Sequence, residues 1–158
     1  MSYQCPVCGE IHNEPPTLTF RWPDPYAAVP EGERAARVKG NTDTCVIDGG
    51  FYVQGTILIP ITGTTGHLGI GIWVSQSAEN FLTYLDNFNT ATIGPFPGLL
   101  SNNVPFYNPG TLAMKITAHF QGEKMRPLIR PEPSDHELCV DYAKGVSLDR
   151  AWSIAHAR

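Results

Sequence analysis

Long hydrophobic runs are missing from this sequence of 158 residues. No apolar stretch approaches the ~20 residues that a membrane-spanning helix needs. The first ten residues, MSYQCPVCGE, also lack the basic stretch and apolar core of a signal peptide. We therefore expect no membrane association and a cytoplasmic location. In that compartment the four cysteines are more often free thiols or metal ligands than disulfides.

Positive charge is scarce. Eleven Lys and Arg stand against fifteen Asp and Glu, which gives a formal net charge of −4. The basic residues are scattered, and the tightest group (Arg34, Arg37 and Lys39) lies beside Glu31 and Glu33, as on a solvated helix face. Nucleic-acid binding relies on clustered Lys and Arg, so we expect that this protein does not bind nucleic acid.

The familiar catalytic motifs are absent as well. The sequence contains no G-x-x-x-x-G-K-[ST], no G-x-S-x-G and no H-E-x-x-H. A Cys/His hydrolase stays open as an alternative, because such residues meet in space and not in sequence. Its candidates are Cys45 or Cys139 with His119 or His136, while His156 is expected near the frayed end of the last helix.

Alternating apolar residues are the clearest signal that is present. They run through TCVIDGGFYVQGTILIPI and again through HLGIGIWVSQS, with Gly49 and Gly50 placed for a β-hairpin. Residues 17–22 and 111–121 also read as strands, and 127–130 as a strand that returns from the latter. Because the strands come in hairpins, an antiparallel sheet is expected.

Helices are predicted between these strands. One covers residues 30–39, and the next begins after Ser77, with Phe81, Leu82, Leu85 and Phe88 on its apolar face. A third runs from Ser134 or Asp135 to Lys144, and the last is capped by Ser147. Residues 94–110, rich in Pro and Asn, are expected to form a long loop.

The predicted fold class is α+β. An antiparallel sheet built from hairpins would carry helices mainly on one face, together with an N-terminal zinc knuckle. The length suits a single domain, 1–158, with an N-terminal segment 1–48, a sheet region 49–130 and C-terminal helices 131–158.

The stretch CPVCGEIH carries the strongest chemical signal. A C-x-x-C pair with Pro6 after the first cysteine and Gly9 after the second is similar to a zinc knuckle, and thiolates are soft ligands that suit Zn²⁺. Zinc takes four ligands, and two completions of Cys5 and Cys8 compete. One uses His12 and Cys45. The other uses His136 and Cys139, which lie three residues apart on one face of a predicted helix.

The whole chain resembles a bacterial family known as domain-of-unknown-function family 2199. The matching stretches are CPVCGEIH, DTCVIDG, GIWVSQS, RPLI and SDHEL. In that family the Cys pair, the following His and the Cys before the hairpin strand recur, so the resemblance implies Cys5, Cys8, His12 and Cys45 as ligands. The family's DHPLA is DHELC here, which marks Cys139 as particular to this sequence. The resemblance implies a shape and a metal, and it brings no activity.

Three thiolates and one imidazole would form a closed site, and closed zinc sites are structural. The sequence therefore favours a small, zinc-stabilised binding protein over an enzyme, with Trp22 and Trp73 as candidate anchors for a protein partner. Its sharpest version is an immunity or inhibitor protein against a bacterial toxin, because an acidic protein suits a basic partner. The alternative is a zinc- or Cys/His-dependent hydrolase of unknown substrate.

Overall fold

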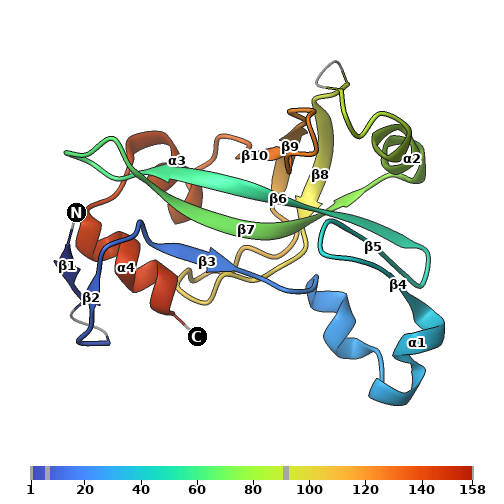
Figure 1. Cartoon of the computed structure of the whole chain (residues 1–158), viewed down its shortest axis with the longest axis horizontal. Coiled ribbons are helices and arrows are strands. Elements are labelled where there is room, and N and C mark those ends of the chain that lie inside the picture. The colour runs from blue at the N-terminus through green and yellow to red at the C-terminus, as the bar shows by residue number, and fades with distance from the viewer. Residues whose placement is uncertain (1, 6–7, 91–92, 158) are drawn as a thin grey trace.

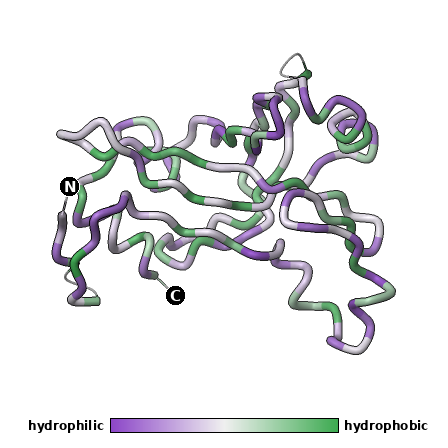
Figure 2. The backbone as a smooth tube through the Cα atoms, viewed as in Figure 1, coloured by the Kyte–Doolittle hydropathy of each residue, from purple (hydrophilic) through white to green (hydrophobic). Residues whose placement is uncertain are grey.

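A long hairpin lies at the centre of the fold. The computed structural model describes residues 2–5, 8–90 and 93–157. Strands β6 (Gly50–Pro60) and β7 (His67–Gln76) pair antiparallel from Phe51 opposite Gln76 to Pro60 opposite His67. Hydrophobic residues recur along both strands where they cross the middle of the molecule (Figures 1 and 2). The hairpin predicted around Gly49 and Gly50 is a different one, and it is confirmed: β5 (Thr44–Ile47) pairs antiparallel with the start of β6, with Ile47 opposite Gly50.

Further strands lead from β7 back to β6. They are β8 (Phe96–Leu100), β9 (Lys115–His119) and β10 (Leu128–Pro131). Each pairs antiparallel with the strand before it, and β10 reaches β6 through one parallel register pair, Leu128 with Thr56. The protein is therefore α+β, with a mostly antiparallel sheet that is partly closed on itself.

The remaining strands lie at the edges. β3 (Thr17–Thr19) pairs parallel with β7, while β5 (Thr44–Ile47) and β4 (Val38–Gly40) extend the sheet beyond β6. A separate two-stranded sheet consists of β1 (Tyr3–Gln4) and β2 (Ile11–His12). In Figure 1 this small sheet stands at the opposite end of the molecule from β4 and β5.

The helices are short, and serine caps begin two of them. They are η1 (Asp24–Ala28), η2 (Glu31–Glu33), α1 (Arg34–Arg37), α2 (Ala78–Asp86), α3 (Glu137–Lys144) and α4 (Leu148–His156). Ser77 Oγ accepts a hydrogen bond from the backbone of Asn80, and Ser147 Oγ accepts one from Arg150, as the sequence predicted. Among the described residues, no helix has the length and apolarity to cross a membrane.

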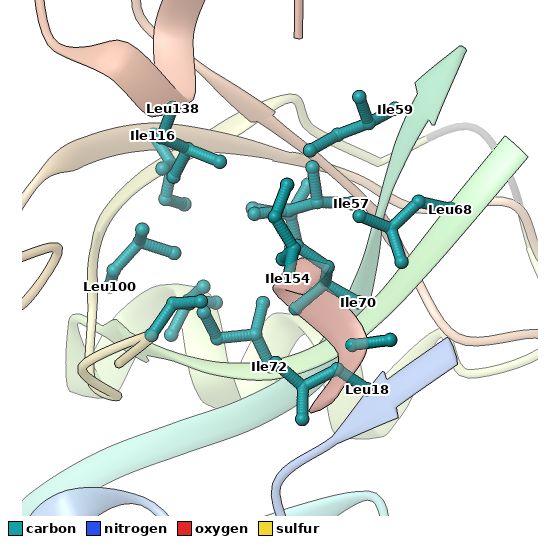
Figure 3. Packing of buried hydrophobic residues seen from close by; sticks show 14 of the residues in the cluster. Leu18, Ile57, Ile59, Leu68, Ile70, Ile72, Leu100, Ile116, Leu138 and Ile154 are labelled. Carbon is teal, nitrogen blue, oxygen red and sulfur yellow. The ribbon is translucent and has the colours of Figure 1, made fainter. Parts of the chain in front are cut away.

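Two clusters of buried side chains lie on opposite faces of β7. Ile70, Ile72 and Val74 point into the larger one. The buried residues of α2 and α4 and the side chain of Leu138 from α3 belong to the same cluster. Figure 3 shows Ile154 of α4 among the isoleucines of β6 and β7. Trp73 points the other way, because neighbouring residues of a strand alternate between faces. It joins a smaller cluster with Val29, Cys45 and Ile47.

The predicted loop 94–110 was partly wrong, because it contains β8. Pro97 lies within this strand, opposite Thr117. Gly98 allows β8 to lie close to β7, since a Cβ at this position would stand 2.3 Å from the carbonyl oxygen of Ser75. A segment with several Pro and Asn residues is typical of a loop. Here residues 96–100 form a strand because they pair with the neighbouring strands of the partly closed sheet.

Two other boundaries moved. The strand expected over 111–121 is reduced to β9, because the chain turns at Ala113, whose φ of 67° leaves the extended region. The helix expected over 30–39 is divided between η2 and α1, and its last residues form β4, which pairs with β5.

The apolar face of α2 also differs. Phe81 and Tyr84 are buried, whereas Leu82 and Leu85 are exposed. The first turn of α3 is capped by neither Ser134 nor Asp135. Instead His136 occupies the cap, and its Nδ1 accepts a hydrogen bond from the backbone N–H of Leu138.

Candidate metal centre

The small β1–β2 sheet places three candidate ligands at one end of the chain. Tyr3 pairs with His12 across this sheet. The turn between the strands is tied by hydrogen bonds from Cys5 N to Glu10 O and from Gly9 N to Cys5 O, both 2.8 Å. Gly9 has a φ of +76°, which explains a glycine after the second cysteine. Pro6 lies outside the described residues.

Helix α4 brings a fourth candidate from the other end of the sequence. His156 occupies its last turn, one helical turn after Trp152. One ligand atom from each of Cys5, Cys8, His12 and His156 lies within 4.8 Å of the other three. The structure thus brings together three of the predicted ligands and adds a histidine that had been expected to lie at a frayed helix end.

Aromatic packing fixes the two imidazoles against α4. The ring of His12 stacks on Trp152 with centroids 3.8 Å apart, and the ring of His156 lies 5.4 Å from the same indole. Tyr3 stacks on Trp152 as well and donates a hydrogen bond to the carboxylate of Asp149. Trp152 is therefore the surface on which β1, β2 and the end of α4 meet.

The polar contacts within the cluster are incomplete. Cys8 Sγ lies 3.2 Å from His12 Nε2. His156 Nε2 is buried and has no hydrogen-bond partner among the described residues. A buried polar nitrogen without a partner costs free energy, so its presence calls for an explanation such as a bound ion.

The donor set fits a tetrahedral metal site. Zinc bonds of about 2.3 Å to sulfur and about 2.0–2.1 Å to nitrogen place tetrahedral donors roughly 3.3–3.8 Å apart. The four atoms already lie within 4.8 Å, so side-chain shifts of about 1 Å would close the site around an ion. Cys5 is buried, Cys8 is exposed and both histidines are partly buried, so one thiolate remains at the surface.

Cys45 is not part of this cluster. It lies on β5 in the smaller core, with no exposed surface, beside Val29, Ile47 and Trp73. Burial raises the pKa of its thiol to about 11. The residue predicted as the fourth ligand is therefore packed as an apolar side chain.

The alternative ligands His136 and Cys139 make hydrogen bonds at the start of α3 instead. His136 Nδ1 caps the helix, and its Nε2 faces the carbonyl oxygens of Pro109 and Gly110 at 2.9 and 3.2 Å. Cys139 Sγ lies 3.2 Å from both Ser134 Oγ and Glu132 O. Within the described ranges, neither residue belongs to a group of three or more possible metal ligands.

Three members of the candidate Cys/His pairs, His119, His136 and Cys139, have other polar partners. His119 Nε2 lies 2.8 Å from Thr117 Oγ1, and burial together with Arg130 lowers the pKa of this imidazole. Among the described residues, no hydrogen bond joins Cys45 or Cys139 to His119 or His136.

The two candidate anchor tryptophans differ in exposure. Trp73 has no exposed surface, and its Nε1 donates to the carbonyl oxygen of Phe20 at 3.0 Å, so it offers nothing to a partner. Trp22 is half-buried and stacks on Tyr26 with centroids 4.4 Å apart. Arg34 lies over the Tyr26 ring, 4.3 Å from its centroid.

Comparison with known proteins identifies the family. A family model described as an uncharacterized protein conserved in bacteria (DUF2199) matches residues 4–146 of the chain, which therefore belongs to this family. No curated protein and no solved structure matches the chain. Cys5, Cys8 and His12 lie inside the matched stretch, whereas His156 lies beyond it.

Proposed function

We propose that the protein is a small binding protein whose N-terminal sheet and C-terminal helix are joined by one structural zinc ion. The ligands are Cys5, Cys8, His12 and His156. The observation that carries the proposal is the convergence of two thiols and two imidazoles within 4.8 Å, one imidazole nitrogen being buried without a partner. Two Cys and two His form a familiar structural zinc set.

The stability of the small sheet supports this role. β1 and β2 contain two residues each, far fewer than a free hairpin needs to persist in water. Zinc binding in small zinc-finger peptides contributes apparent free energies of about 10–16 kcal/mol at neutral pH. An ion held by both β1–β2 and α4 would therefore determine whether this end of the molecule is ordered.

The four protein ligands also argue against hydrolysis at the metal. A catalytic zinc keeps one position open for water, and a complete Cys2His2 set leaves none. The thiol alternative lacks support too, because the pKa of Cys45 is raised by burial, and a nucleophilic thiol needs the opposite shift.

Metal content tests the zinc site directly. We expect one zinc per chain in purified protein, and its loss in Cys8→Ser and His156→Gln. Cys45→Ser and Cys139→Ser are the matched controls and should keep the ion. Absence of zinc from the reduced wild-type protein, or its loss only in the two control variants, would contradict the proposed ligand set.

The partner is proposed to be a protein with a basic surface, such as a bacterial toxin of the nuclease class. The support is the net charge of −4, which steers an acidic protein towards a basic one. Trp22 remains the candidate anchor, since part of its surface is exposed. Affinity capture with wild-type protein and Trp22→Ala at micromolar concentration tests this. Failure to retain a basic partner at low salt would count against it.

A further inference from the structure

The four thiols of the chain differ sharply in accessibility. Cys8 is exposed, and Cys5 supplies a sulfur within 4.8 Å of it. Cys45 is fully buried with a raised pKa, and Cys139 is buried with its sulfur held between Ser134 and Glu132. An oxidant in solution therefore meets one cysteine, and that cysteine has a second sulfur beside it.

We propose that the metal centre is a peroxide-sensitive switch in which Cys5 and Cys8 form a disulfide and release the ion. The inference rests on the proposed zinc site and adds a regulation to it. Metal-bound cysteines are thiolates, which are the nucleophilic form. Cys8 is exposed and the sulfur of Cys5 lies within 4.8 Å of it, so the site supplies the two requirements of a thiol switch, which are an attacking sulfur and a resolving one.

The oxidation balances with hydrogen peroxide as the oxidant. The Cys8 thiolate attacks one peroxide oxygen, the O–O bond breaks, and a sulfenic acid and one hydroxide result. The sulfur of Cys5 then attacks the sulfur of Cys8, the S–O bond breaks, and a second hydroxide leaves. Two thiolates thus lose two electrons, and two protons from solvent convert the hydroxides to water. With two of the four ligands gone, His12 and His156 alone would hold the ion too weakly to keep it.

Release of the ion removes the link between the β1–β2 sheet and α4. The contacts that remain include the packing of Cys5 in the larger core, the stacking of Tyr3 and His12 on Trp152, and the hydrogen bond from Tyr3 to Asp149. Opening of this small sheet would uncover the indole of Trp152, which is 6% exposed in the closed form. Oxidation would therefore expose an aromatic surface at the end of α4.

The experiment uses reduced, full-length protein whose zinc content has been measured first. Hydrogen peroxide is then titrated in the presence of a chromophoric zinc indicator, and disulfides are located by peptide mass mapping. We expect release of one zinc per chain together with a Cys5–Cys8 disulfide. After treatment with dithiothreitol and zinc, we expect the disulfide to be reduced and one zinc per chain to be bound again. Cys45→Ala and Cys139→Ala should respond as the wild type does.

The outcomes separate the two proposals. If the reduced protein holds no zinc, the proposed site fails and the switch fails with it. If zinc is present but stays bound under excess peroxide, or leaves without a Cys5–Cys8 disulfide, only the switch is overturned. A disulfide that involves Cys45 or Cys139 would also overturn it, because the order of accessibility would then be incorrect.

Discussion

Replacement of Trp152 by alanine tests whether the aromatic platform supports the metal centre. The indole is 6% exposed and packs against Tyr3, His12 and His156. Loss of a buried Trp costs about 3–5 kcal/mol of the free energy of unfolding. For a chain of this length each kcal/mol corresponds to about 2–4 °C in Tm, so we expect Trp152→Ala to lower Tm by about 6–20 °C.

The same substitution should also weaken zinc binding. The indole orients the two imidazoles, and loss of such supporting groups typically lowers metal affinity by about 10- to 100-fold. Scanning calorimetry measures the first effect, and competition with a chromophoric chelator measures the second.

Trp73→Ala provides a matched control, because this Trp is also buried but belongs to the smaller core with Cys45. It should lose a similar amount of stability and keep its zinc affinity. If Trp152→Ala bound zinc as tightly as the wild type, or if both variants lost affinity equally, the platform would have no specific role.

Other predictions follow from separate parts of the fold. Tyr107→Phe removes the 2.6 Å hydrogen bond to buried Asp141, which should cost about 1–3 kcal/mol and lower the urea midpoint without changing the m-value. Burial raises the pKa of Cys45 from 9.0 to about 11, so as the pH rises the thiol ionises in the unfolded chain at a lower pH than in the folded protein. Stability should therefore fall as pH rises between these values, and fall less in Cys45→Ala; equal slopes in urea titrations would contradict this. Phe81→Ala should cost about 3–5 kcal/mol, whereas Leu82→Lys on the exposed face should stay within about 0.5 kcal/mol in thermal melts, and a large loss in Leu82→Lys would show that this face is covered.

Features that depend on a few neighbouring residues could be predicted from the sequence. Ser77 and Ser147 cap helices because their hydroxyls need only reach a backbone N–H within the next turn. The hairpin before β6 turns at Asp48 and Gly49, both with positive φ, so the short range of the turn residues was sufficient.

Features that depend on distant strands could not. β8 is a strand because β7 and β9 provide hydrogen-bonding partners on its two sides, and nothing in the run that contains Pro97 signals this. The return of β10 to β6 is equally invisible, since it rests on the register pair of Leu128 with Thr56. Local alternation predicts that strands exist, but not that their order partly closes the sheet.

The candidate site divides in the same way: Cys45 was expected as a ligand from the family resemblance, and His156 was not expected as one. Cys5, Cys8 and His12 lie within eight residues, so their convergence follows from one turn. A buried thiol such as Cys45 packs as a small apolar group and requires no ligand, so its presence near a hairpin carried little information. A buried imidazole nitrogen does require a partner. The sequence held one usable signal: His156 follows Trp152 by four residues, which places it on the same face of the last helix as this buried tryptophan.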